Sequence, residues 1–211
     1  AWSDGGVDVV VQVVSRTEAV AAVEAGVDGL LASGSEAGGR IGETEAFILF
    51  QQVIDLGVPV WVRGGIGLHT AAAAVAGGAA GVVLDAQLAL VREAKLDPDL
   101  QQAIRAADGS ETRVVGGHRF YTRPDLPAAA VPADTTAEEV ATFLGPDLRT
   151  QLVPVGQDCG FASGLAERFV TVGGVVQAVQ AAIDEHLAAA AQQLPLAPGN
   201  GVARAHGTLS L

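Results

Sequence analysis

The sequence between residues 7 and 94 alternates between short apolar segments and helix-like segments, and this alternation constrains the fold more than any other feature. The first apolar segment is almost continuous in valine, which is typical of a parallel strand covered on both faces. Gly26 and Gly57 stand where helices should end and a left-handed residue is needed. Strands that alternate with short helices in this way predict right-handed parallel crossovers. The strand segments are 7–14, 29–33, 58–62 and 81–84.

Four strand–helix units leave a choice between part of a barrel and an open doubly wound sheet. An eight-stranded barrel takes about 250 residues, so four units fill half of one. We predict an α/β fold, the C-terminal half of a TIM-type (βα)8 barrel followed by a mostly helical extension. The chain lacks an initiating methionine, and we expect a fragment whose open sheet edges pair with another chain or with its own later segments. The helices of the units are expected at 15–26, with Thr17 as N-cap, at 44–56, at 69–76 and from about Ala86 onward.

After the fourth unit the pattern changes and helices dominate. Gly116 and Gly117 lie at the centre of an expected hairpin over 111–122. Thr136 followed by Glu139 forms a capping-box pattern at a helix start. The helices of this region are expected at 97–107, 136–144, 161–169 and 174–193. The three predicted parts of the chain are a half-barrel over 1–95, a mainly helical extension over 96–193 and a linker over 194–211.

Charge and cysteine content exclude several classes of function. The chain has 24 acidic and 12 basic residues and a formal net charge of -12, so nucleic acid and anionic membrane surfaces would repel it. No segment approaches the ~20 apolar residues that span a bilayer. No cluster of histidine, cysteine or carboxylate residues has metal-ligand spacing, so we expect no metal site. Cys159 is the single cysteine; it cannot form an internal disulfide and indicates a reducing, cytoplasmic location, and we expect its thiol to be inert.

Loops that follow the strands of a parallel barrel lie on one face, where active sites form. Residues 36–40, 63–67 and 85–87 should therefore meet. The loop 63–67 reads Arg-Gly-Gly-Ile-Gly before a helix, and it offers free backbone N–H groups at a positive helix end, which is how proteins hold a phosphate. The alternative is a tight turn between strand and helix that needs glycine dihedrals.

A second loop, Glu-Ala-Gly-Gly at 36–39, follows directly on an apolar strand one unit before that glycine-rich loop. The combination resembles the nitronate monooxygenase and FMN-dependent enoyl reductase family over residues 7–95, and more loosely at Gly156 and Gln157. The resemblance implies FMN as cofactor and NADPH as the reductant of the flavin. In relatives that serve fatty acid and polyketide synthases it implies a substrate carried on acyl carrier protein. The implied cofactor-binding residues are Glu36, Gly38, Gly39, Gly64, Gly65 and Gly67.

Further segments are similar to a nitronate-monooxygenase-like region near the start of large actinobacterial type I polyketide synthases. In those proteins a stretch similar to 206–208 leads into a second barrel of the same kind. The resemblance implies that the chain is part of a megasynthase that acts on carrier-bound acyl chains, with the other domains of that megasynthase as partners; a homodimer is also considered. The similar segments are 36–42, 64–71, 77–85 and 114–119.

Two residues depart from the flavoenzyme pattern. Arg40 stands where nitronate monooxygenases have a histidine base, and its guanidinium cannot abstract a proton at working pH, which argues against nitronate oxidation. Asp85 stands where an FMN barrel supplies glycine and a hydroxyl residue, and a carboxylate there repels a phosphate by ~1 kcal/mol in water at 4 Å. Arg40 and Arg63 on the same face either pair with Asp85 or meet the phosphate. Glu36 either orients a flavin ring or an arginine, or pairs with Arg40.

Two hypotheses follow from these residues. In the first, the chain is part of an FMN- and NAD(P)H-dependent enoyl reductase region, with Arg40 or His69 near the substrate enone as catalytic residues. In the second, the barrel is a degenerate copy that no longer binds FMN and serves as a structural or docking element. Asp85 and Arg40 favour the second hypothesis. His118 and His186 are expected to be packing or surface residues.

Overall fold

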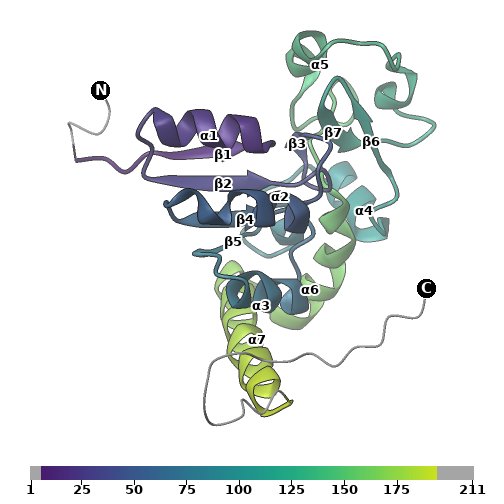
Figure 1. Ribbon diagram of the computed structural model, residues 1–211. Helices are drawn as coiled ribbons and strands as arrows, with labels where there is room; N and C mark the ends of the chain where they lie inside the picture. The colour runs from purple at the N-terminus through teal and green to yellow at the C-terminus, as the bar shows by residue number, and fades with distance from the viewer. Residues whose placement is uncertain (1–5, 194–211) are drawn as a thin grey trace, which may run out of the picture.

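Two β-sheets organise residues 6–193, the part of the chain that this computed structural model describes (Figure 1). The first sheet is parallel and the second is antiparallel. The parallel sheet contains, in spatial order, β1 (Val10–Val13), β2 (Gly29–Ser33), β4 (Val60–Arg63) and β5 (Gly81–Val83). The antiparallel sheet contains β3 (Gly39–Arg40), β7 (His118–Tyr121) and β6 (Thr112–Val115).

Each strand of the parallel sheet lies beside the next parallel strand along the chain, with Val11 paired to Leu30 and Leu30 to Val60. Three helices connect these strands: α1 (Arg16–Glu24), α2 (Ala46–Val53) with η2 (Ile54–Leu56), and α3 (Leu68–Ala76). The predicted α/β fold with a parallel sheet is confirmed. Within residues 6–193, β1 and β5 are the edges of this sheet, and β6 and β7 pair with β3 instead. The expectation that later segments replace missing strands is therefore wrong for the described residues.

The helix ends follow the local sequence, with two corrections. Gly26 and Gly57 adopt φ of 84° and 86°, the left-handed conformation predicted at these two positions. The N-cap of α1 is Ser15, whose Oγ accepts the N–H of Glu18 at 3.2 Å, so the prediction of Thr17 was wrong. The helix expected near Ala86 is only a 3-10 turn, η3 (Ala86–Leu88).

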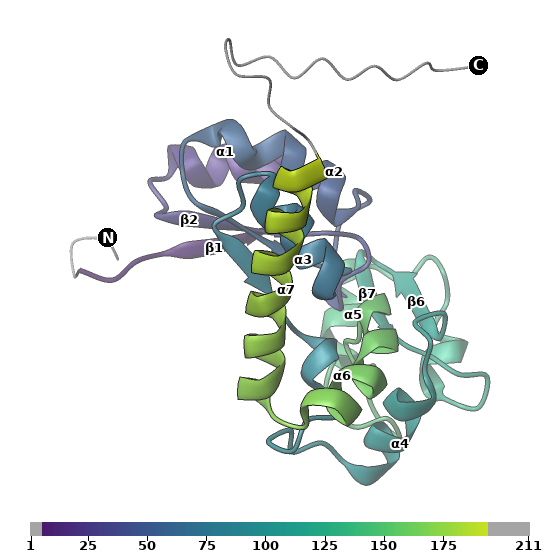
Figure 2. The ribbon, with the colours of Figure 1, turned by 90° about the horizontal axis from the view of Figure 1, so that it is seen from below.

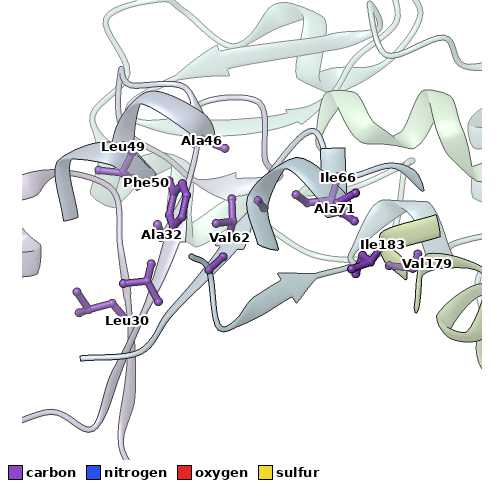
Figure 3. Packing of buried hydrophobic residues seen from close by; sticks show 14 of the residues in the cluster. Leu30, Ala32, Ala46, Leu49, Phe50, Val62, Ile66, Ala71, Val179 and Ile183 are labelled. Carbon is purple, nitrogen blue, oxygen red and sulfur yellow. The ribbon is translucent and has the colours of Figure 1, made fainter. Parts of the chain in front are cut away.

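One face of the parallel sheet and its helices form the main core (Figure 3). Leu30, Ala32 and Val62 are completely buried and alternate along their strands, as expected when one face of each strand meets the helices. Val179 and Ile183 of the last helix, α7 (Val172–Gln193), join the same core. The core of the first part of the chain is therefore shared with its last described helix.

The opposite face of the sheet lies outside this core. Trp61 lies on it between two glycines of the flanking strands: a Cβ added to Gly29 would be 2.7 Å from the indole, and one added to Gly81 would be 3.0 Å from it. The indole therefore takes the space that side chains would occupy on both neighbours. Val10, on the edge strand β1, is 48% exposed on the same face. This face is only partly covered by the described residues.

The later part of the chain contains the predicted hairpin and helices (Figure 2). Strands β6 and β7 form the hairpin, and Thr136 and Glu139 form the predicted capping box. Strand β3, from the first part of the chain, pairs with β7 and so joins the sheet of the hairpin. The long helix α7 packs against α3. The helical elements are α4 (Pro98–Ala106), η4 (Pro127–Ala130), α5 (Ala137–Phe143), η5 (Gln157–Phe161), α6 (Ala162–Phe169) and α7.

The division of the chain at residue 95 remains a prediction. The shared core and the pairing of β3 with β7 show that the parts on either side are packed together. The predicted linker over 194–211 lies outside the described residues.

Candidate functional site

Arg63, the last residue of β4, joins the loops that follow β2, β4 and β5. Its guanidinium donates to Ser33 Oγ at 3.1 Å and to the carbonyl oxygen of Gly38 at 2.9 Å. It also forms an ion pair with Asp85, which follows β5. The Arg63 side chain is 14% exposed and the Asp85 side chain is 39% exposed, so the ion pair is partly shielded from water. The three loops meet at one end of the sheet, and of the two roles considered for Arg63, pairing with Asp85 is the one observed.

The side chain of Gln87 links the loop after β5 to the loop after β4 by hydrogen bonds. Its side chain is completely buried. Its Oε1 accepts the backbone N–H of Asp85 at 2.7 Å, and its Nε2 donates to the carbonyl oxygen of Ile66 at 2.8 Å. The amide of Asp85 is therefore bound within the protein and is not free to hold an anion. Sequence reasoning included Gln87 in the loop but missed this bridging role.

Glu36 fills the space inside the glycine-rich loop. Its carboxylate accepts the backbone N–H of Ala46 at 3.1 and 3.3 Å and so caps the start of α2. Gly64 and Gly65 have φ of 108° and 62°, and a Cβ on either would lie 3.2 Å from the Glu36 side chain. Both glycines are thus required by a positive φ and by the close approach of Glu36. The alternative pairing of Glu36 with Arg40 was wrong.

Arg40 faces away from this group of loops. It lies in β3, and its guanidinium pairs with Glu18 of α1, with Nη1 3.2 Å from Oε2. The hydrogen bonds from Arg40 are the main reason that the pKa of Glu18 lies below its usual value. The Arg40 side chain is half exposed. A catalytic role for Arg40 remains a prediction. The expectation that Arg40 pairs with Asp85 was wrong, because its observed partner is Glu18.

His69 lies at the start of α3 and faces the long helix. Its Nδ1 is 2.9 Å from Nε2 of His186 in α7. The Gly67 N–H at the N-cap of the same helix donates to Thr70 Oγ1 at 2.7 Å. The predicted role of His69 near a substrate remains a prediction, and its observed contact is between helices. His118 is a packing residue, as expected, with Nδ1 2.9 Å from the carbonyl oxygen of Gly116.

The segment that leads into η5 covers the loop after β2. Gln157 N–H donates to the carbonyl oxygen of Glu36 at 2.8 Å. A Cβ added to Gly38 would be 2.7 Å from the backbone nitrogen of Gly156, so Gly38 is required by close backbone contact. This contact accounts for Gly38 without any cofactor. Gly39, in β3 with φ of 75°, is required by its left-handed backbone.

Asp158 lies under this covering segment and was missed by sequence reasoning. It is 1% exposed, and within the described residues neither carboxylate oxygen has a hydrogen-bond partner. Burial, and then the charge of Asp85, raise the pKa of Asp158 to about 7, while Arg63 acts in the opposite direction. The carboxyl group therefore gains and loses its proton closer to neutral pH than an exposed aspartate does. Nothing in the sequence marks this residue, because its burial depends on loops more than 70 positions earlier.

Arg119 of β7 ties the antiparallel sheet to the same loops. Its Nε donates to the carbonyl oxygen of Ser35 at 2.7 Å, and its Nη1 donates to Thr112 Oγ1 at 2.8 Å. Burial lowers the pKa of Arg119, and the charges of Glu36 and Asp158 oppose that shift. Two arginines and three carboxyl groups thus gather at the strand ends.

Comparison with known proteins places this arrangement in a family. The family model of nitronate monooxygenase matches residues 1–123, which is more than half of the chain. The chain belongs to the nitronate monooxygenase family. The curated putative monooxygenase Rv1533 of Mycobacterium tuberculosis is 38% identical over 91 residues, which is 42% of this chain and 24% of that protein. The chain thus spans about a quarter of that curated relative.

Solved structures of this family's fold extend the match beyond residue 123. FabK from Thermotoga maritima superposes with a TM-score of 0.74 at 25% identity, over 90% of this chain and 65% of FabK. Nitroalkane oxidase from Streptomyces ansochromogenes gives a TM-score of 0.71 at 23% identity, over 89% of this chain and 60% of the oxidase. The enoyl reductase domain of MlnA from Bacillus amyloliquefaciens gives 0.55 at 10% identity, over 89% of this chain and 69% of that domain. The last two likenesses show the fold alone.

The residues at the strand ends do not fit the phosphate of FMN, the cofactor typical of this family. Arg63, the cation nearest to the end of β5, is already paired with Asp85. Glu36 lies against the glycine loop that would hold the phosphate. A phosphate dianion placed beside Asp85 and Glu36 would be repelled by both carboxylates, and this repulsion grows as water is excluded. The donor set therefore favours positive or neutral groups over a phosphate.

Proposed function

We propose that this chain is half of a nitronate-monooxygenase-like barrel within a polyketide or fatty acid megasynthase, and that it acts there as a structural or docking element. The observation that carries the non-catalytic role is the ion pair between Arg63 and Asp85 at the position expected for a flavin phosphate. The megasynthase setting rests on the sequence resemblance. Carrier-bound acyl chains and the other domains of that megasynthase are the proposed partners.

The ion pair makes flavin binding costly. A phosphate that used Arg63 would have to break the pair and leave Asp85 beside the phosphate. Because the Asp85 side chain is 39% exposed, breaking the pair costs about 1–2 kcal/mol, between the values for surface and buried pairs, which lowers the affinity for FMN about 5- to 30-fold. Gln87 adds to this cost because it already holds the Asp85 amide. Arg63 and Gln87 hold the three loops together through contacts within the protein, which suits an architectural role.

The partly covered face of the parallel sheet is the proposed docking surface. Its edges are β1 and β5, and Trp61 and Val10 lie on the face itself. In most proteins, the edge strands of a parallel sheet are paired or covered. We propose that neighbouring strands of the megasynthase, or a second copy of the chain, cover β1 and β5. Sedimentation analysis should then show a dimer or a complex, and a stable monomer with exposed edges would contradict this part of the proposal.

A second candidate is an FMN- and NADPH-dependent enoyl reductase. It is favoured by family membership and by Gly64 and Gly65, whose left-handed backbone before α3 is the form that phosphate loops use. FMN would then supply hydride transfer to an enone. In this reading the six residues predicted from the resemblance would contact the cofactor. Arg40 and His69 would have to leave Glu18 and His186 to reach a substrate.

Flavin content distinguishes the two candidates. The intact region should be purified, tested for flavin absorbance, and reconstituted with FMN as wild type, as Asp85→Gly and as Asp99→Gly, a control that removes an exposed carboxylate also paired with arginine. We expect wild type and the control to stay colourless and not to oxidise NADPH with an enoyl thioester. Stoichiometric flavin in the wild type would overturn the structural role. Flavin binding by Asp85→Gly alone would locate the loss at that residue.

A cytoplasmic location belongs to the same proposal and follows from the single, unpaired cysteine. Within residues 6–193, the structure contains no helix with the length and apolar character needed to cross a bilayer.

A further inference from the structure

Two histidine rings meet where α3 packs against α7. Nδ1 of His69 lies 2.9 Å from Nε2 of His186, and the two ring centroids are 4.7 Å apart with 43° between the ring planes. His69 is exposed and His186 is partly buried, so solvent reaches the pair. Neither candidate function depends on the contact between these two rings.

The helices that carry the two rings are held together by buried residues. Val179 and Ile183, on the same helix as His186, lie in the main core together with Ala71 of α3. Leu187, the residue after His186, packs against the same core. Helices fixed in this way keep two side chains at a set separation, which is the preorganisation that a binding site needs.

The arrangement of the rings differs from that of an in-line hydrogen bond. In such a bond the N–H of one ring points along the lone pair of the other, which would place the ring centroids about 5.2 Å apart at this separation of the nitrogens. The observed distance between the centroids is 4.7 Å. The rings are therefore bent away from the line that joins the two nitrogens.

Two imidazole nitrogens bound to one metal ion would have this spacing. Bonds of about 2.0–2.1 Å that meet at a right angle place the nitrogens about 2.9 Å apart and the ring centroids about 4.5 Å apart. The same bonds at the tetrahedral angle would place the nitrogens about 3.3 Å apart. The measured 2.9 Å and 4.7 Å agree better with the right angle. Right angles between ligands are typical of Cu²⁺ and Ni²⁺, whereas Zn²⁺ prefers the tetrahedral angle.

The rest of the coordination shell would come from solvent. Within residues 6–193, no group of three or more histidine, cysteine or carboxylate side chains is arranged to hold a metal ion. Two imidazoles would thus be the protein ligands, and water would fill the other positions. Imidazole suits copper and nickel as a ligand, and the formal net charge of -12 attracts cations to the protein.

We propose that His69 Nδ1 and His186 Nε2 bind one divalent transition-metal ion of the Cu²⁺ and Ni²⁺ class, and that this ion fastens α7 to α3. The proposal goes against the expectation from sequence that the chain has no metal site. That expectation was based on spacing along the chain, and these two histidines are 117 positions apart. The site depends neither on FMN nor on the megasynthase setting.

Calorimetric titration of the untagged full chain with Cu²⁺ and with Ni²⁺ tests the proposal. We expect one saturable site in the wild type, and a loss of at least tenfold in affinity in His69→Ala and in His186→Ala, because each variant lacks one of the two protein ligands. His206→Ala, which removes the histidine outside the described residues, is the matched control and should bind as the wild type does.

Two further measurements report on the site itself. The electron paramagnetic resonance spectrum of the Cu²⁺-loaded wild type should show coupling to imidazole nitrogen, and this coupling should be weaker in each of the two variants. Saturating Ni²⁺ should raise the midpoint of thermal unfolding of the wild type and of His206→Ala, because it binds the folded state. The midpoints of His69→Ala and His186→Ala should not rise.

Several outcomes would overturn the proposal. One is the absence of saturable binding of Cu²⁺ and Ni²⁺ by a wild-type protein that circular dichroism shows to be folded. Others are equal affinity in the wild type and either of the two variants, or a loss of binding in His206→Ala. Tighter binding of Zn²⁺ than of Cu²⁺ would contradict the right-angle geometry. FMN binding by the wild type would refute the structural role without affecting this test, so the two proposals fail separately.

Discussion

Replacing Asp158 by asparagine should stabilise the protein at high pH and should do so in a pH-dependent way. Burial raises the pKa of Asp158 to about 7 in the folded protein, from a usual value of 3.8 in the unfolded chain. The folded state therefore holds a proton that the unfolded state has lost between about pH 4 and pH 7. The wild type loses stability as pH rises through this window and levels off above it. With 1.36 kcal/mol for each pKa unit, the full loss is about 4 kcal/mol.

Urea unfolding of wild type and Asp158→Asn at pH 5, 6, 7 and 8 measures this effect. The free energy of unfolding of the variant relative to the wild type should rise by about 2–3 kcal/mol from pH 5 to pH 8, because the remaining titrations cancel in the difference. Asp134→Asn, the exposed control, should show a flat difference. A flat difference for Asp158→Asn as well would refute the claim that Asp158 is buried without a partner.

Three other substitutions or reactions test neighbouring contacts. Arg63→Met should lower the free energy of unfolding, measured by urea titration, by about 2–4 kcal/mol. Arg149→Met removes an exposed pair, with 78% of the arginine side chain accessible, and should cost less than about 1 kcal/mol in the same titration. Equal losses would contradict the shielding of Arg63. Gly38→Ala should lower the free energy of unfolding by about 2 kcal/mol, because the new Cβ would meet the adjacent backbone. Gly164→Ala, in open space within α6, should raise the free energy of unfolding by about 0.5–1 kcal/mol, and thermal unfolding measures both changes. Burial raises the pKa of Cys159 to about 12, so the thiol should react with a chromogenic disulfide reagent only when urea unfolds the protein, and rapid reaction of the native protein would contradict its burial.

The elements of the fold could be predicted because their patterns are local. Valine-rich strands, left-handed glycines at 26 and 57 and the Thr136 capping box depend on neighbouring residues. Ser15 and Thr17 are both good N-caps, and sequence alone does not decide which one the chain uses. The turn at η3 contains the buried Gln87, whose side chain bonds to the Asp85 amide and to the carbonyl oxygen of Ile66 in an earlier loop, and no helical periodicity reports these contacts.

The meeting of the strand-end loops was predicted, but most partners of their side chains were not. Parallel topology alone brings the strand-end loops together, and the opposite charges of Arg63 and Asp85 made their pairing foreseeable. The direction of Arg40 depends on the pairing of β3 with β7, whose residues lie almost 80 positions later. The contact of His69 with His186 is likewise made between helices 117 residues apart. Asp158 carries no local signal because distant loops bury it.

Equilibrium dialysis of the wild-type protein against FMN measures whether the strand-end loops hold a flavin. We predict no excess of FMN on the protein side, because Asp85 already neutralises Arg63 and Gln87 already holds the Asp85 amide. One FMN retained for each chain, at a concentration of flavin comparable to that of the protein, would contradict it.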